Sequence, residues 1–232
     1  KLFREERERP VWLVADLGPA LFFGSRRQLK SALIVRAAAL LAWIAALGGD
    51  RVGAVIGAGA GSRASASGTR VLPPRAREAG VLPLLEALLA LQPRAPAAGA
   101  GSCLPDALRT LMPLVRPGSL VLLLSDFAGL DAQLETQCSA LAVSGECRLF
   151  WITDTLEERA LPDGRFRAGF PGRLRVLDGE RVRGAWQAAW RERAARLAAL
   201  SQRIAAQLIR LDTGEAVEQA LRPLLQGQPT AA

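Results

Sequence analysis

The chain has 232 residues, half of them hydrophobic, which is enough for one α/β domain with a sizeable core. It contains no His and no Tyr, so imidazole bases, Ser-His triads, His metal sites and tyrosyl acids are excluded. Its net charge of +8 comes almost entirely from arginine, since Lys1 and Lys30 are the only lysines. This positive charge has two alternative explanations. The protein binds an anionic partner, or, more simply, a coding bias puts Arg and Ala wherever they are tolerated.

The chain is predicted to begin with a buried strand that ends on an acid, Asp16. Residues 11–16 are a short apolar run between Pro10 and Gly18, and such a run is typical of a strand buried on both faces. The elements expected next are a helix over 29–47, a strand over 52–58, an edge strand over 68–73, and helices over 80–91 and 104–115.

A second buried strand, over 119–125, also leads into an acid, Asp126. The elements expected after it are a helix over 130–144, a strand over 146–152, a Gly- and Pro-rich excursion with a hairpin over 155–184, a helix over 185–207, a strand over 208–211 and a helix over 215–225. This alternation predicts an α/β fold with a doubly wound, mostly parallel sheet and helices on both faces. We expect the two acid-bearing strands to be adjacent at its centre, with both acids at the carboxyl edge, where ligands bind in such sheets.

Residues 1–232 are predicted to form a single domain, the C-terminal part of a longer protein. The apolar helix over 29–47 carries Arg36 and is short for a membrane span, which favours a buried helix. Three cysteines without CxxC spacing, at positions 103, 138 and 147, indicate free thiols in a reducing compartment. We therefore expect a cytoplasmic protein, with membrane attachment through a missing N-terminal part as the alternative.

Several short motifs follow one another in a characteristic order. They are the strand ending at Asp16, GSRRQLK at 24–30, GDRVG at 49–53, GSCLPDAL at 101–108, Ser125-Asp126-Phe127, and DTLE at 154–157 with LPDG at 161–164. In this order and spacing the chain, from about residue 4 to residue 225, resembles the von Willebrand factor A-like domains. More narrowly, it resembles an uncharacterised bacterial family of such domains found with MoxR-type AAA+ ATPases.

The resemblance implies a metal-ion-dependent adhesion site with the pattern Asp-x-Ser-x-Ser, a Thr in a later loop and a final Asp. Asp16 matches the first acid, Asp126 matches the last, and Ser102 stands in the place of the Thr. Gly18 and Ala20 occupy the two serine positions and offer no side-chain oxygen. Because Mg²⁺ requires several oxygen ligands, we expect a degenerate site that binds Mg²⁺ weakly or not at all.

Each of these three residues also has an ordinary structural explanation. Asp16 and Asp126 would accept hydrogen bonds from backbone N–H groups in their own turns. Ser102 would cap the helix over 104–115.

Two further pairs of residues have alternative explanations. Glu157 and Glu158 are either a catalytic carboxylate cluster or, as the resemblance implies, residues that organise the excursion over 155–184. Trp186 and Trp190 lie four residues apart on one helix, so they are either core aromatics or an exposed docking pair.

The function that we favour is a non-enzymatic protein-interaction domain, and the resemblance implies that it works with a MoxR-type AAA+ ATPase or its client protein. No catalytic residue or cofactor is expected beyond weakly bound Mg²⁺. Partner binding is expected at the loops over 17–27, 93–102 and 127–130, with Asp126 and Phe127 as contacts. Phe127 is expected either to be exposed for this purpose or to pack inward beneath its loop.

Two alternative functions come from other classes. The first is a nucleic-acid-binding domain that uses an Arg-rich surface, which a continuous basic face would favour. The second is a hydrolase that resembles the haloacid-dehalogenase-like phosphatases, which would need a second acid where Gly18 stands.

Overall fold

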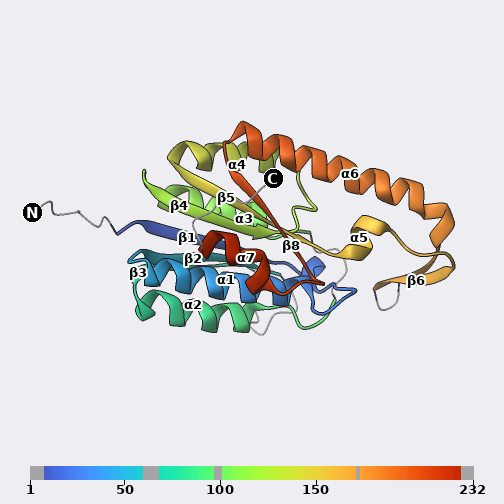
Figure 1. The fold of residues 1–232 in the computed structure, drawn as a ribbon, viewed down its shortest axis with the longest axis horizontal. Helices are drawn as coiled ribbons and strands as arrows, with labels where there is room; N and C mark the ends of the chain where they lie inside the picture. Colours follow the sequence, from blue (N-terminus) through green and yellow to red (C-terminus); the bar gives the residue numbers. More distant parts are fainter. Residues whose placement is uncertain (1–7, 60–67, 97–100, 171–172, 226–232) are drawn as a thin grey trace, which may run out of the picture.

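The computed structural model describes residues 8–59, 68–96, 101–170 and 173–225. Within them, one sheet has the strand order β3-β2-β1-β4-β5-β8 (Figure 1). These strands are β1 Pro10–Leu17, β2 Arg51–Ala58, β3 Gly68–Ala76, β4 Ser119–Ser125, β5 Gly145–Thr153 and β8 Gln207–Asp212. At one edge β3 runs antiparallel to β2, and the other neighbouring strands are parallel.

The two acid-bearing strands are neighbours at the centre of the sheet, as predicted. β1 pairs with β4 in parallel, with Val11 opposite Leu120. Side chains of β1 alternate between the two faces, so that Leu13 joins one hydrophobic core and Trp12 the other. The parallel pairing places Asp16 and Asp126 at the same carboxyl edge.

Helices cover both faces of the sheet (Figure 1). One layer contains α1 Lys30–Leu47, α2 Glu78–Leu91 and α7 Val217–Leu225, and the opposite layer contains α3 Leu104–Leu111, α4 Ala132–Ser144 and α6 Gly179–Arg203. The predicted α/β fold with a mostly parallel sheet is therefore confirmed.

The excursion between β5 and β8 contains the short helix α5 Thr155–Arg159 and a hairpin of β6 Arg165–Phe170 with β7 Arg173–Asp178. The start of α6 extends with the hairpin beyond the end of the sheet (Figure 1). The predicted helix start at residue 185 is wrong, because α6 already begins at Gly179. Asp178 caps the helix there by accepting a hydrogen bond from the backbone N–H of Arg181 at 3.3 Å.

The helix predicted over 104–115 also ends earlier, at Leu111. A single turn of 3-10 helix, Met112–Leu114, follows it, since Pro113 lacks the N–H that a continuing α-helix needs. All three cysteines are free, as predicted, and Cys138 and Cys147 are buried.

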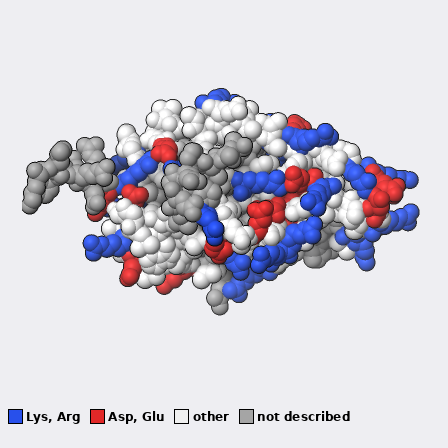
Figure 2. All heavy atoms as spheres, in the orientation of Figure 1, with Lys and Arg blue, Asp and Glu red and all other residues white. Residues whose placement is uncertain are grey.

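Basic and acidic side chains are interspersed on the face of the molecule shown in Figure 2. Several arginines also pair with nearby acids. Arg196 and Arg203 both bind Glu135, at 2.8 and 2.9 Å, and Arg210 binds Glu158 at 2.5 Å. On that face, the positive charge therefore does not form a continuous basic surface.

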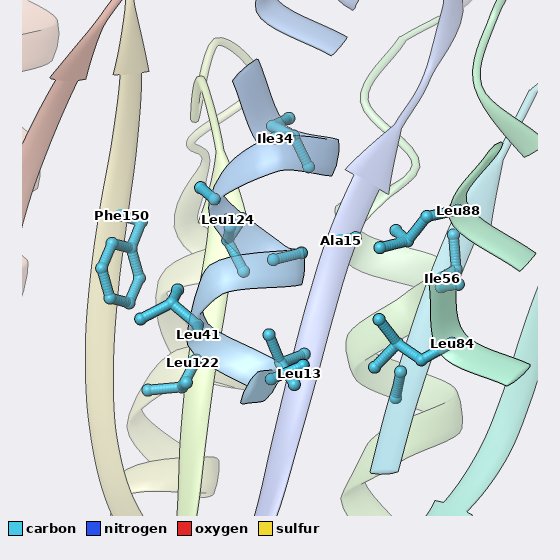
Figure 3. Close-up of a cluster of buried hydrophobic side chains, with 14 of the residues drawn as sticks. Leu13, Ala15, Ile34, Leu41, Ile56, Leu84, Leu88, Leu122, Leu124 and Phe150 are labelled. Atoms are coloured by element: carbon cyan, nitrogen blue, oxygen red, sulfur yellow. The ribbon is translucent and has the colours of Figure 1, made fainter. Parts of the chain in front are cut away.

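Helix α1 occupies the centre of one hydrophobic core. Figure 3 shows its Leu41 beside Leu13 of β1 and Leu122 of β4, with Ile34 further along the helix towards Leu124. By length and composition alone α1 is apolar enough to cross a membrane. Its packing against the sheet is that of a core helix, and it brings the first residue of the helix, Lys30, to the carboxyl edge of the strands.

Candidate functional site

Asp16, at the end of β1, is completely buried and accepts four hydrogen bonds. Its Oδ1 accepts from the backbone N–H groups of Gly18 and Cys103, at 3.1 and 3.0 Å. Its Oδ2 accepts from the hydroxyls of Ser102 and Ser125, at 2.6 and 2.8 Å. Burial and the nearby charge of Asp126 raise the pKa of Asp16, and the hydrogen bonds only partly offset this.

Ser102 has two roles at this point. Its hydroxyl donates to Asp16 and accepts a hydrogen bond from the backbone N–H of Leu104 at 3.1 Å. The side chain therefore helps to satisfy the first turn of α3, but the N-cap residue is Cys103, not Ser102 as the capping explanation had predicted. Asp16 contributes to the same helix start through Cys103, so one carboxylate links the end of β1 to the beginning of α3.

Asp126, at the end of β4, is bound by a buried lysine. Its Oδ2 lies 3.1 Å from Nζ of Lys30, and its Oδ1 accepts from the backbone N–H of Ala128 at 3.0 Å. The Lys30 side chain is only 1% exposed, and its Nζ also lies 2.6 Å from Oε1 of Glu157. The ammonium group thus bridges β4 and α5 inside the protein, and the ring of Phe23 lies 5.7 Å from it.

Lys30 is buried at the start of a helix, and its positive charge requires nearby negative charges for two reasons. A cation in the first turn of a helix is disfavoured by the helix dipole, and burial of an unpaired ammonium costs several kcal/mol more. Asp126 and Glu157 supply the opposite charges. Burial is also the main reason why the pKa of Glu157 is raised, although Lys30 opposes the shift.

Another buried acid, Asp154, holds neighbouring loops together at this edge. Its carboxylate accepts from the backbone N–H of Ser25 at 2.7 Å, from the hydroxyls of Ser25 and Thr213, and from the backbone N–H of Leu156 at 2.9 Å. Burial alone would raise the pKa of Asp154, but these hydrogen bonds lower it. Asp154 is thus the cap of α5 and a connection between the segments that follow β1 and β8.

The expectation that Phe127 is exposed for partner binding is wrong, because its side chain is completely buried in the core beneath α3, α4 and α6. Its backbone has a φ of +49°, in the left-handed region. The hydroxyl of Ser125 and the carboxylate of Asp126 hold this turn by accepting from the two following backbone N–H groups. Asp126, 5% exposed and already bound to Lys30, is also poorly placed to contact a partner.

The two glutamates of α5 bind other parts of the fold. Glu157 binds Lys30, and Glu158 binds Arg210 of β8. These contacts attach the excursion to α1 and to the sheet, respectively, which agrees with the organising role that the resemblance implied. Trp190 is buried and stacks on Trp151 with ring centroids 4.8 Å apart, so this residue is a core aromatic.

Three of the predicted site residues, Asp16, Ser102 and Asp126, do come together at the edge, but the sequence interpretation missed Lys30. A signal for it was present in the composition, since Lys30 is one of only two lysines among 30 basic residues. It also begins a helix that is apolar almost all round and therefore buried. Such a lysine needs buried acids close by.

The residues at this edge do not fit a divalent cation. Lys30 already places a positive charge on Asp126, and a second cation beside it would be repelled. No serine fits at position 18 without a shift of the backbone, because a Cβ on Gly18 would lie 3.0 Å from the carbonyl oxygen of Gly101. Within the described residues, no group of three or more acids and cysteines is arranged to hold a metal ion.

We expect isothermal titration with Mg²⁺ or Mn²⁺ to show weak binding or none. The physical reason is the charge of Lys30 together with the missing oxygens at Gly18 and Ala20. The matched control is Asp16→Ala, which removes the principal remaining carboxylate. Micromolar binding to the wild-type protein that this substitution abolishes would contradict the prediction.

The fold has a counterpart among solved structures. The chain is similar to the conserved hypothetical protein BatB from Bacteroides thetaiotaomicron, with a TM-score of 0.56 and 12% sequence identity over 94% of this chain and 99% of that chain. At this identity the similarity concerns the fold alone. No curated protein sequence matches the chain.

The chain also matches the model of a protein family. The family model described as "Protein of unknown function DUF58" matches residues 1–197, which is most of the chain. The von Willebrand A-like architecture seen in the structure agrees with this match. The chain therefore belongs to the DUF58 family, whose function is unknown.

Proposed function

We propose that this chain is a non-enzymatic protein-interaction domain that works with a MoxR-type AAA+ ATPase in the assembly or activation of other proteins. The observation that carries the proposal is the internal saturation of the acids at the carboxyl edge. Asp16 accepts four hydrogen bonds from the protein, and Lys30 is shared between Asp126 and Glu157. Asp16 and Asp126 are thus bound on both carboxylate oxygens, which supports a stabilising role for them over that of a nucleophile or a general base, whereas Oε2 of Glu157 has no partner within the described residues.

The hydrolase alternative loses support for a specific steric reason. A phosphatase of the haloacid-dehalogenase-like type would need an acid at position 18. A Cβ there would lie 3.2 Å from Oδ1 of Asp16 and 3.0 Å from the carbonyl oxygen of Gly101. A side chain at position 18 would therefore require these neighbours to move by a few tenths of an ångström, and a carboxylate there would lie beside that of Asp16.

The distribution of charge supports a protein partner over nucleic acid. On the face shown in Figure 2, acidic side chains lie among the basic ones. A surface of mixed charge is more typical of a protein interface than of a groove that follows a phosphate backbone.

The exposed loops at the carboxyl edge are the proposed contact surface. The segment that follows β1 carries exposed Arg27, and the end of α5 carries exposed Arg159. Part of the loop predicted over 93–102 lies outside the described residues. Loops at this edge converge from several strands, whereas the opposite edge only connects elements.

Binding to a purified MoxR-type ATPase from the same genome neighbourhood tests the proposal. We expect the double variant Arg27→Glu/Arg159→Glu to weaken binding by about tenfold or more, because charge reversal in an interface introduces repulsion. The matched control is Arg116→Glu, an equally exposed arginine at the opposite edge of the sheet. Absence of binding by the wild-type protein, or equal weakening by the control, would contradict the proposal.

A further inference from the structure

A groove runs between α6 and the segments that follow β4 and β5. It consists of two adjoining hollows, of about 180 and about 230 Å³, that share Ala189 and Arg193 of α6. The far wall of the first hollow is the turn at Phe127 and Ala128, and the second lies against Glu157. The groove therefore adjoins the carboxyl edge without using the buried acids.

The second hollow is lined by two tryptophans that the fold holds in place. Trp190 stacks on Trp151, whose indole N–H donates to the backbone carbonyl of Asp126 at 3.2 Å. Trp186 is half-buried, and its indole N–H donates to the backbone carbonyl of Glu157 at 2.9 Å. Aromatic surfaces fixed in this way bind an apolar side chain at little cost in conformational entropy.

Arg193 is the charged residue that lines both hollows. Further along the same helix, Arg196 and Arg203 both bind Glu135. Arg193 is half-buried, yet none of the N–H groups of its guanidinium has a hydrogen bond or ion pair within the described part of the chain. Arg193 opposes the raised pKa of Glu157, but no hydrogen bond or ion pair joins the two side chains: Oε1 of Glu157 binds Lys30, and its Oε2 is buried without a hydrogen-bond partner. The guanidinium fork is therefore available to a carboxylate from outside, which it can bind through two parallel hydrogen bonds.

We propose that the groove lined by Trp186, Ala189, Trp190 and Arg193 binds a segment of a partner protein in which an acidic residue lies beside an apolar one. The carboxylate binds Arg193, and the apolar side chain lies mainly on Trp186, because Trp190 is only 8% exposed. Glu192, on the rim of the first hollow, is exposed and solvated, so it does not replace the missing acceptor. This inference rests on the proposed function as an interaction domain and identifies the chemistry of the bound segment.

Selection from a library of random short peptides displayed on phage tests this inference with the whole chain as bait. We expect enriched peptides to carry Asp or Glu next to an apolar residue. Synthetic copies of these peptides should bind Arg193→Gln about tenfold more weakly than the wild-type protein. They should bind Ala189→Trp as weakly, because the large side chain fills the groove from an exposed position.

Matched controls lie on the same helix. Arg191→Gln removes an exposed arginine outside the groove, and Ala188→Trp adds the same bulk at an exposed position that does not line it. Both should bind the peptides as the wild-type protein does, and thermal melts followed by circular dichroism should show that all four variants fold. Enrichment of no peptide, enrichment of peptides without acids, or unchanged binding by Arg193→Gln and Ala189→Trp would overturn the inference.

The same variants separate this inference from the proposed function. An ATPase that binds the wild-type protein and Ala189→Trp equally would leave the interaction role standing and overturn the role of the groove. An ATPase that fails to bind the wild-type protein would contradict the proposed function, while the peptide measurements would still decide the chemistry of the groove.

Discussion

Replacement of Lys30 by methionine is expected to lower the free energy of unfolding by about 3–5 kcal/mol. The variant keeps the volume of the side chain but leaves Asp126 and Glu157 buried without a cation, and loss of one partner of a buried ion pair has this magnitude. Urea unfolding followed by circular dichroism measures the change.

An exposed ion pair provides the control for this substitution. Arg109 and Asp106 lie 2.6 Å apart, but their side chains are 61% and 70% exposed. Arg109→Met is therefore expected to cost less than about 1 kcal/mol. A cost of Lys30→Met as small as that of the control would show that the ammonium is not held between the two acids.

Asp16→Ala is expected to destabilise the protein by about 3 kcal/mol, because it leaves the donors of Gly18, Ser102, Cys103 and Ser125 without their acceptor. Asp16→Asn retains the shape and an acceptor oxygen, so it should cost much less. Both values come from urea unfolding at neutral pH. Equal costs for the two variants would mean that the hydrogen bonds do not determine the stability of this edge.

The comparison with Asp16→Asn also has an expected pH dependence. The pKa of Asp16 is raised in the folded protein from 3.8, so the folded state favours the protonated acid. The stability of the wild-type protein relative to Asp16→Asn should therefore be greatest below about pH 4 and should fall as the pH rises through the raised pKa. Urea unfolding of both proteins from acid to neutral pH tests the sign, and an increase with pH would contradict it.

The sequence was sufficient to predict the central strands and the place where their acids meet. Residues 11–16 and 119–125 are short apolar runs, and each leads into an acid, so the edge of the sheet follows from local pattern and parallel topology. The absence of side-chain oxygens at Gly18 and Ala20 could also be recognised directly from the sequence around Asp16. Each of these inferences depends on residues that are close together in the chain.

The contacts of Lys30 could not be predicted in this way. Its partners lie 96 and 127 residues further along, so only the complete fold brings them to the helix start. The inward orientation of the Phe127 side chain could not be predicted either, because it depends on a left-handed backbone conformation that Ser125 and Asp126 stabilise. Contacts between side chains that are distant in the chain therefore cannot be predicted from local sequence patterns.

The hydrogen bonds of Asp16 bear on the order in which the chain folds. Only Gly18 is a local partner, since Cys103 and Ser125 lie 87 and 109 residues further along. Asp154 is likewise separated by 129 residues from Ser25. Closure of such long loops is slow, and β1 cannot bury its terminal acid with all its donors until β4 has been synthesised and paired. The carboxyl edge is therefore completed late, after the strands on which it stands.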